Sequence, residues 1–159
     1  KTVSLLPNVL AKQEAVKSGA AECWMVDEAG LVTEATASNA WIVTPEGQLV
    51  TRPADHDILN GITRRAIFAL AKAAGLKAEE RAFSVEEARG AREAFITSAS
   101  MFLTPVVSID GQSVGNGHPG SFSLQLRESY VATAKDRSRK RVARPRTWLV
   151  ARGREHAQN

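Results

Sequence analysis

Two segments combine small residues and hydroxyl groups in an order that could bind an oxyanion. The first, Leu59-Asn60-Gly61-Ile62-Thr63-Arg64, opens a stretch with helical periodicity. Glycine lets the backbone approach a ligand closely, and the N–H groups of a first helical turn have no partner within the helix. With the Thr63 hydroxyl beside them, these groups are typical of a phosphate site. Many helices begin this way without an anion, so the segment alone favours an ordinary helix start.

The second segment is Thr97-Ser98-Ala99-Ser100, which directly follows an apolar strand. Hydroxyls and free N–H groups at a strand end can complete an anion-binding nest, although an ordinary Ser/Thr turn has the same composition. Together, the segments around Thr63 and Ser98 predict a two-sided phosphate cradle that neither supports alone.

A third candidate is Glu34, which follows Leu31-Val32-Thr33 and is close in sequence to Asn39. If this carboxylate is buried, it requires a cation or a protonated nitrogen as its partner. If it lies in a solvated loop, it requires none, and both readings stay open. Local sequence indicates only that Lys1 is an exposed terminal residue. We expect no metal site in this protein.

The chain length of 159 residues is typical of one domain, and 43% hydrophobic and 24% charged residues are typical of a soluble protein. No apolar run approaches the roughly 18 residues that span a bilayer. The first seven residues are too few and too polar for a secretory signal. Cys23, the single cysteine, excludes an internal disulfide and is expected to be a buried structural thiol. We therefore expect a cytoplasmic protein without membrane contact.

The net charge of +4 is unevenly distributed. Residues 135–159 hold nine Lys or Arg and two acids, which leaves 12 basic and 15 acidic residues in 1–134. The body is therefore mildly acidic and carries a basic extension, so nucleic acid is not expected as a partner of the whole protein. The extension lacks a sustained apolar face, and we expect it to be poorly ordered.

Periodicity and turn residues predict a mixed α+β domain. Three helices are expected at 5–18, after Gly61 and near 121–134, and a short one is opened by the capping box Ser84-x-x-Glu87. In the helix after Gly61, the apolar positions are Ile62, Ala66, Ile67, Leu70 and Ala71. An antiparallel meander is expected from Ala21–Val26, Leu31–Val32 and Ala40–Val43, followed by a strand at Leu49–Val50. Further strands are expected at Arg81–Phe83, Ala94–Thr97 and Pro105–Ile109, with a turn at Asp110-Gly111.

Spaced residues along 1–134 resemble the fold-type IV (class IV) aminotransferases, which use pyridoxal 5'-phosphate. The pattern is Glu34-x-Thr36-x-x-Asn39-Ala40-Trp41, then Leu49-x-Thr51, then Leu59-x-Gly61-Ile62-x-Arg64. Several fixed positions at matching separations make this more specific than a lone glycine motif. The opening residues 1–15, Phe95–Ser100 and Thr104-Pro105-Val106 resemble the D-amino acid transaminase branch in particular.

The resemblance implies a role for each matched residue. Lys1 corresponds to the lysine that forms the Schiff base and moves the proton between the substrate Cα and the cofactor, for which it must be neutral when free. Glu34 corresponds to the carboxylate that keeps the pyridine nitrogen protonated. The remaining matches are Leu59 against the cofactor ring, Gly61, Ile62 and Thr63 at the phosphate, and Ser98 and Ala99 on the opposite wall of the cradle.

The implied activity is transamination between a D-amino acid, such as D-alanine or D-glutamate, and a 2-oxo acid. Branched-chain aminotransferases and aminodeoxychorismate lyases would share Lys1, Glu34 and the cradle, and a non-catalytic cofactor-binding remnant is a further alternative. The resemblance also implies a homodimer and the large domain of the D-amino acid aminotransferase-like fold. Residues 1–134 correspond to the C-terminal cofactor-binding domain, so the N-terminal small domain, which supplies an arginine to the phosphate and the substrate-carboxylate groups, is missing from this sequence.

Three positions depart from the pattern. Trp41 replaces Phe or Tyr, Ala35 replaces a common glycine, and Ala99 replaces a hydroxyl residue. Ala99 would then bind phosphate through its backbone N–H only.

Overall fold

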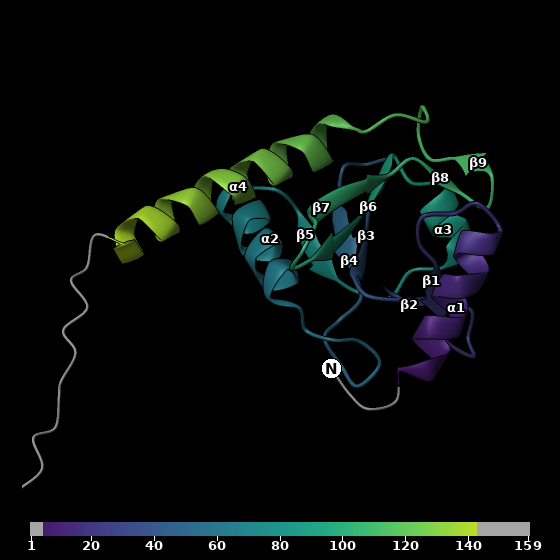
Figure 1. Ribbon diagram of the computed structural model, residues 1–159. Helices are drawn as coiled ribbons and strands as arrows, with labels where there is room; N and C mark the ends of the chain where they lie inside the picture. The colour runs from purple at the N-terminus through teal and green to yellow at the C-terminus, as the bar shows by residue number, and fades with distance from the viewer. Residues whose placement is uncertain (1–4, 143–159) are drawn as a thin grey trace, which may run out of the picture.

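The computed structural model describes residues 5–142, with side chains for 5–136. Helices and strands alternate irregularly along the chain, as expected for an α+β protein (Figure 1). The elements in chain order are α1 Leu6–Lys17, β1 Trp24–Val26, β2 Val32–Ala35, β3 Asn39–Val43, β4 Leu49–Thr51, α2 Ile62–Ala73, β5 Ala78–Glu80, α3 Val85–Arg89, β6 Glu93–Ser98, β7 Phe102–Val106, β8 Ser108–Ile109, β9 Gln112–Ser113 and α4 Ser121–Val142.

A five-stranded sheet in the order β5-β4-β3-β6-β7 forms the centre of the fold. Its strands pair antiparallel except for β4 and β5, which are parallel and are connected through α2. Because successive side chains of a strand point to opposite faces, Trp41 and Val43 pack on one face and Ala40 and Ile42 on the other. Both faces of β3 are buried, which explains its continuous apolar run.

Helices α2 and α4 cover the face of the sheet that carries Trp41 (Figure 1). Trp41 stacks on Phe95 with ring centroids 5.5 Å apart, and its indole N–H donates to the Thr97 hydroxyl over 2.9 Å. The buried core on this face consists of Trp41, Val43, Leu49, Ile67, Ala71, Phe95, Leu103 and Leu126. The aromatic residue that departs from the family pattern is therefore fully accommodated in the core.

The antiparallel meander expected from the first apolar runs is only partly correct. β1 and β2 form a separate two-stranded sheet, whereas β3 pairs with β4 and β6 in the central sheet. The chain changes sheets between Ala35 and Asn39, where Ala35 N donates to Ser38 O over 2.7 Å in a tight turn. This change of sheet places the end of β2 beside the start of β3.

The strand predicted at Arg81–Phe83 is wrong, because β5 lies earlier, at Ala78–Glu80. Parallel pairing with β4 decides the position: Leu49 N donates to Lys77 O, and Arg81 N donates to Thr51 O. The capping box is confirmed, since Ser84 Oγ accepts a hydrogen bond from Glu87 N at the start of α3.

The Asp110-Gly111 turn is confirmed as the connection between β8 and β9. Both residues have positive φ angles, 50° and 77°, as a tight two-residue hairpin requires.

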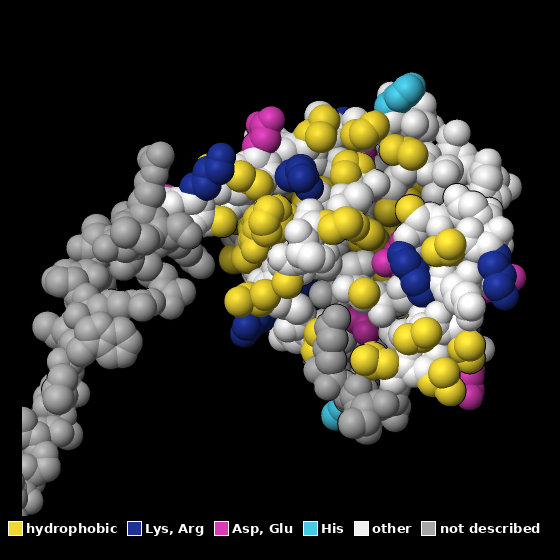
Figure 2. Space-filling view, in the orientation of Figure 1, with side chains coloured by type: hydrophobic (Ala, Val, Ile, Leu, Met, Phe, Trp, Pro, Cys, Tyr) yellow, Lys and Arg dark blue, Asp and Glu magenta, His cyan; other side chains and the backbone are white. Residues whose placement is uncertain are grey.

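Helix α1 begins with Pro7 in its first turn and is followed by Gly19, as predicted. Only Ala15 of this helix is buried, so most of its apolar side chains remain exposed. Hydrophobic side chains are visible over α1 in the space-filling view (Figure 2). They belong to Leu6, Val9, Leu10 and Val16.

Helix α4 begins at the predicted position but continues past residue 134 to Val142 and projects beyond the sheet (Figure 1). The helix therefore extends into the segment that was expected to be poorly ordered, and residues 143–159 lie outside the described residues. Cys23 is partly exposed rather than buried, which corrects that prediction. The pKa of the Cys23 thiol is raised, mainly by partial burial and secondly by the negative charge of Glu22. The thiolate, which is the nucleophilic form, is therefore disfavoured.

Candidate functional site

Glu34 lies on β2 at the point where this strand meets the segment that leads into α2. Its Oε2 accepts a hydrogen bond from Leu59 N over 3.0 Å and another from Asn39 Nδ2 over 3.1 Å. Asn39 Nδ2 also donates to Leu59 O over 2.7 Å. The half-buried carboxylate is thus oriented by residues from β3 and from the loop before α2, and it lies on a strand and not in a loop.

Gly61 is required by the close approach of Asn39. A Cβ on residue 61 would lie 2.5 Å from Asn39 Oδ1. The φ of Gly61 is −59°, which any residue can adopt, so the available space and not the backbone conformation demands glycine here. Asn39 is 4% exposed and its amide holds two hydrogen bonds, so it cannot easily move aside.

We expect Gly61→Ala to destabilise the protein by about 1–3 kcal/mol, because the added methyl overpacks a fixed amide. The control is Gly90→Ala, whose Cβ would lie 3.5 Å from Glu86 O, an ordinary contact, and which should change stability by less than about 0.5 kcal/mol. Urea unfolding of the two variants measures the difference. Equal urea midpoints for the two variants would show that the Asn39 side chain moves aside without lowering the free energy of unfolding.

The first turn of α2 is an open donor site. Gly61 is the N-cap, and among the described residues the helix has no side-chain cap hydrogen bond. The first N–H groups of a helix have no partner within the helix itself. The Thr63 side chain is buried, and its hydroxyl donates to Ser98 O over 3.0 Å. This bond joins the start of α2 to the end of β6, which brings the two predicted halves of the cradle together.

The turn after β6 forms the second half of the cradle. Ser98 Oγ accepts a hydrogen bond from Met101 N over 3.1 Å and lies 3.5 Å from Ser100 Oγ. Ala99 is exposed at this turn. N–H groups at a helix N-terminus that face hydroxyl groups can bind an oxyanion. The Glu34 carboxylate lies at the other end of the segment Leu59–Thr63, where it binds Leu59 N.

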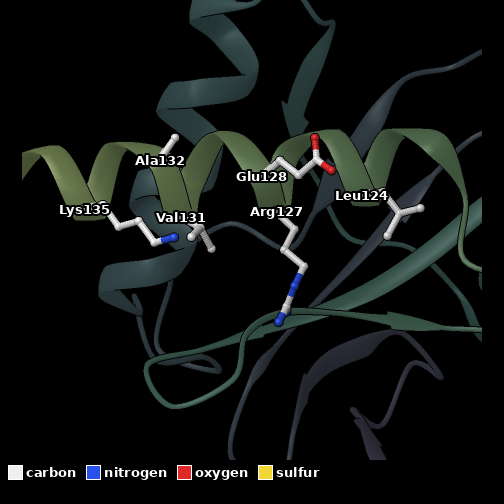
Figure 3. A pocket seen from close by; sticks show the side chains of 6 residues that line it. All are labelled: Leu124, Arg127, Glu128, Val131, Ala132 and Lys135. Atoms are coloured by element: carbon white, nitrogen blue, oxygen red, sulfur yellow. The ribbon is translucent and has the colours of Figure 1, made fainter.

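A shallow hollow of about 480 Å³ lies elsewhere, along α4. Arg127 reaches from α4 towards the strands (Figure 3) and donates to Met101 O over 3.1 Å and to Leu103 O. The hollow is lined by Leu124, Arg127, Glu128, Val131, Ala132 and Lys135. No described residue of the predicted site contributes to it, so it does not belong to the predicted cofactor site.

Within the described part of the chain, no helix has the length and apolar character to cross a membrane. No cluster of three or more His, Cys, Asp or Glu in the same part is placed to hold a metal ion.

Residues 1–109 match the family described as amino-transferase class IV. The chain belongs to this family. It is 41% identical over 126 residues to a D-alanine aminotransferase of Bacillus licheniformis, a match that covers 79% of this chain and 44% of that protein. A D-alanine aminotransferase of Staphylococcus haemolyticus is 38% identical over 138 residues, covering 87% and 48%. The chain thus spans less than half the length of these relatives.

Solved structures in the same family support the fold. The branched-chain amino acid aminotransferase of Thermobaculum terrenum, in its PLP-form, superposes with a TM-score of 0.79 at 32% identity, over 86% of this chain and 44% of that one. The Escherichia coli branched-chain enzyme superposes with a TM-score of 0.77 at 33% identity, over 80% and 43%. The chain therefore has the expected fold of the class IV aminotransferases, which use pyridoxal phosphate.

The class IV match includes every predicted site residue, and the structure places most of them. Glu34, Leu59 and Gly61 meet around Asn39, while Thr63 meets Ser98. Lys1 lies outside the described residues. The expectation that Ile62 lies on the buried apolar face of its helix is wrong, because the residue is 67% exposed.

Sequence reasoning missed the part played by Asn39. Its fixed place in the pattern Glu34-x-Thr36-x-x-Asn39 was the available signal. The buried Asn39 amide donates one hydrogen bond to the Glu34 carboxylate and one to the Leu59 carbonyl. An apolar side chain at this position would leave both acceptors without this donor.

Proposed function

We propose that this chain is the cofactor-binding part of an aminotransferase that transfers amino groups between D-amino acids and 2-oxo acids. D-alanine, D-glutamate and their oxo acids are the proposed substrates. The observation that carries this proposal is the similarity to D-alanine aminotransferases across 79% and 87% of the chain. The matched segments cover only 44% and 48% of those relatives, so the groups that select the substrate carboxylate are proposed to lie in another domain.

The residues present fit pyridoxal phosphate. Gly61 makes room for Asn39, which orients Glu34, and it makes no side-chain cap at the first turn of α2, whose N–H groups are proposed to bind a phosphate. Thr63 and Ser98 close the other side. Glu34 is held by two donors in an orientation that the structure fixes. An anion site and a positioned carboxylate are the two features that the phosphate and the pyridine nitrogen need.

When bound, pyridoxal phosphate supplies an electron sink for the electrons of the substrate Cα–H bond. Glu34 would hold the proton on the pyridine nitrogen and so maintain that sink. The N–H groups of Ile62 and Thr63, with Ser98 and the backbone of Ala99, would hold the phosphate. Leu59 would pack against the ring, and Lys1 would bind the cofactor covalently and carry the proton to and from the substrate Cα.

A branched-chain aminotransferase is the second candidate. The observation in its favour is that the solved structures named above are branched-chain enzymes with TM-scores of 0.79 and 0.77. Their 32% and 33% identity is lower than the 41% and 38% to the D-alanine enzymes, which is why the D-amino acid assignment is preferred.

The absorbance of bound pyridoxal phosphate distinguishes these candidates. We expect the chain loaded with cofactor to show a covalent cofactor band. When the proposed substrate-binding domain is also present, D-alanine should remove this band, and L-leucine and L-alanine should leave it unchanged. Lys1→Ala should lack this band entirely, while Lys12→Ala, which alters another lysine, should keep it. Loss of the band with L-leucine alone would favour the branched-chain assignment. A wild-type chain without any band would contradict cofactor binding by this part of the protein and would support a remnant without activity.

A homodimer and a cytoplasmic location are also proposed. The exposed apolar side chains of α1 support a dimer, because burying them would remove apolar surface from water. Sedimentation equilibrium would detect it. The free thiol of Cys23 supports a reducing compartment.

A further inference from the structure

Arg52 directly follows β4 and begins the loop that leads to Leu59. Its side chain is only 10% exposed and is surrounded by three acids. One terminal nitrogen donates to Asp27 Oδ2 over 2.7 Å, and the other donates to Asp57 Oδ2 over 2.5 Å. Asp55 Oδ2 lies 3.7 Å from Nε. A guanidinium fork of this kind holds two separate carboxylates in a fixed geometry, which a lysine ammonium cannot do.

The first carboxylate belongs to the turn that precedes β2. Asp27 Oδ1 accepts hydrogen bonds from Ala29 N over 3.0 Å and from Leu31 N over 2.9 Å. The pKa of Asp27 lies below its usual range, and the hydrogen bond from Arg52 is the largest cause. The Arg52–Asp27 ion pair therefore stays charged at neutral pH. One arm of the fork therefore anchors the turn from which β2 leads to Glu34.

The second carboxylate lies in the loop itself. Asp57 N donates to Asp55 Oδ1 over 3.0 Å, and the next residue, Ile58, is buried. Leu59 follows, and its N–H donates to Glu34 Oε2. The second arm of the fork therefore anchors the loop two residues before Leu59.

The two arms thus hold the two partners of one hydrogen bond. Asp27 fixes the approach to Glu34, and Asp57 fixes the approach to Leu59. The start of the loop is also pinned, because the buried Arg64 donates to Arg52 O over 2.6 Å. Without the Arg52 cation, Asp27, Asp55 and Asp57 would repel one another across the space that it occupies.

We propose that Arg52 is a positioning residue: by clamping Asp27 to Asp57 it holds the Leu59 N–H on the Glu34 carboxylate and so maintains the proton on the cofactor's pyridine nitrogen. This proposal rests on the proposed cofactor function. It assigns to Arg52 a role that acts through Leu59 and Glu34, without contact between Arg52 and the cofactor.

Two measurements on the full chain test the clamp. The first is hydrogen exchange of the Leu59 amide without cofactor, in wild type, Arg52→Lys, Arg52→Gln and Asp57→Asn. We expect exchange to be faster by about tenfold or more in Arg52→Gln, because two charge-assisted hydrogen bonds are lost. Arg52→Lys should restore only part of the protection, and Asp57→Asn should show an intermediate effect. Arg89→Gln removes a comparable ion pair, the 2.6 Å contact with Asp110, and should leave Leu59 unchanged.

The second measurement is the ¹⁵N chemical shift of ring-labelled pyridoxal phosphate bound to the same variants. We expect a protonated nitrogen in wild type and in Arg89→Gln, and a shift towards the neutral nitrogen in Arg52→Gln. Unchanged Leu59 exchange and an unchanged ¹⁵N shift in a folded Arg52→Gln would overturn the proposal. Faster exchange with an unchanged shift would reduce Arg52 to a structural role and overturn it as well. Failure of wild type to bind the cofactor would instead contradict the proposed function, and the exchange result would still decide whether the clamp exists.

Discussion

Glu34→Gln should lower the transamination rate by roughly 10²–10³-fold while the fold remains intact. The glutamine oxygen can still accept from Leu59 N and Asn39 Nδ2, so the hydrogen bonds that hold the residue are retained. What is removed is the negative charge that would keep the pyridine nitrogen protonated, and the electron sink weakens with it. The effect should therefore appear in kcat rather than in cofactor retention.

The measurement is the initial rate with D-alanine and the oxo acid of glutamate, in cofactor-loaded protein that also contains the proposed substrate-binding domain. Glu46→Gln, which removes an exposed carboxylate from the turn after β3, is the matched control and should retain full activity. Circular dichroism and the unfolding midpoint establish that both variants are folded. If Glu34→Gln turned over at the wild-type rate, Glu34 could not be the group that holds the ring nitrogen.

The largest expected effect on stability belongs to Glu93, at the start of β6. Its side chain accepts hydrogen bonds from Phe122 N over 3.0 Å and from Ser123 N over 2.9 Å, so it caps α4 from another element. It is 6% exposed, and Gly120 leaves the room for it. We expect Glu93→Ala to cost roughly 2–5 kcal/mol, because two N–H groups lose their acceptor and a cavity remains.

Thermal unfolding of Glu93→Ala measures this cost, and a fall in Tm of several degrees should accompany it. Glu128→Ala is the control, since Glu128 lies exposed on the same helix. Glu93→Gln should fall between the two, because one oxygen can still accept but the amide group opposes a second N–H. A Glu93→Ala protein as stable as wild type would mean that water replaces the carboxylate without cost.

Local signals in the sequence were sufficient for features that depend on neighbouring residues. Gly61 before a periodic segment predicted the start of α2, and Ser84-x-x-Glu87 predicted the cap of α3. Asp110-Gly111 predicted its hairpin because the required φ angles are a property of the two turn residues themselves. In each of these features, the interacting residues are only a few positions apart in the sequence.

Features that depend on distant partners could not be predicted in this way. The position of β5 follows from its parallel register with β4, and local strand propensity placed it too late along the chain. Ile62 fits the apolar period, yet Thr63, Ile67 and Ala71, each four residues apart, define the buried side of α2. Nothing near Glu93 indicates that its partners lie at 122 and 123.

The same distinction applies to the candidate site. Residue types and spacing indicated Glu34, Thr63 and Ser98, but not that Asn39 joins Glu34 to Leu59. Arg52 carried no signal at all, since an arginine beside acids in a loop is indistinguishable from a solvated charge until the fold buries it.

The cradle also has a kinetic consequence. Contacts in and around it join residues far apart along the chain: Thr63 to Ser98 within the cradle, Glu34 to Leu59 beside it, and Trp41 to Thr97 in the adjoining core. Each such contact closes a long loop, whose entropy must be overcome before the contact forms. A partly folded chain, with α1 and the first hairpin alone, would have no place for the cofactor. Ligand capture would then be the last event of folding, and a saturating ligand would raise the melting temperature of the entire sheet rather than of one loop.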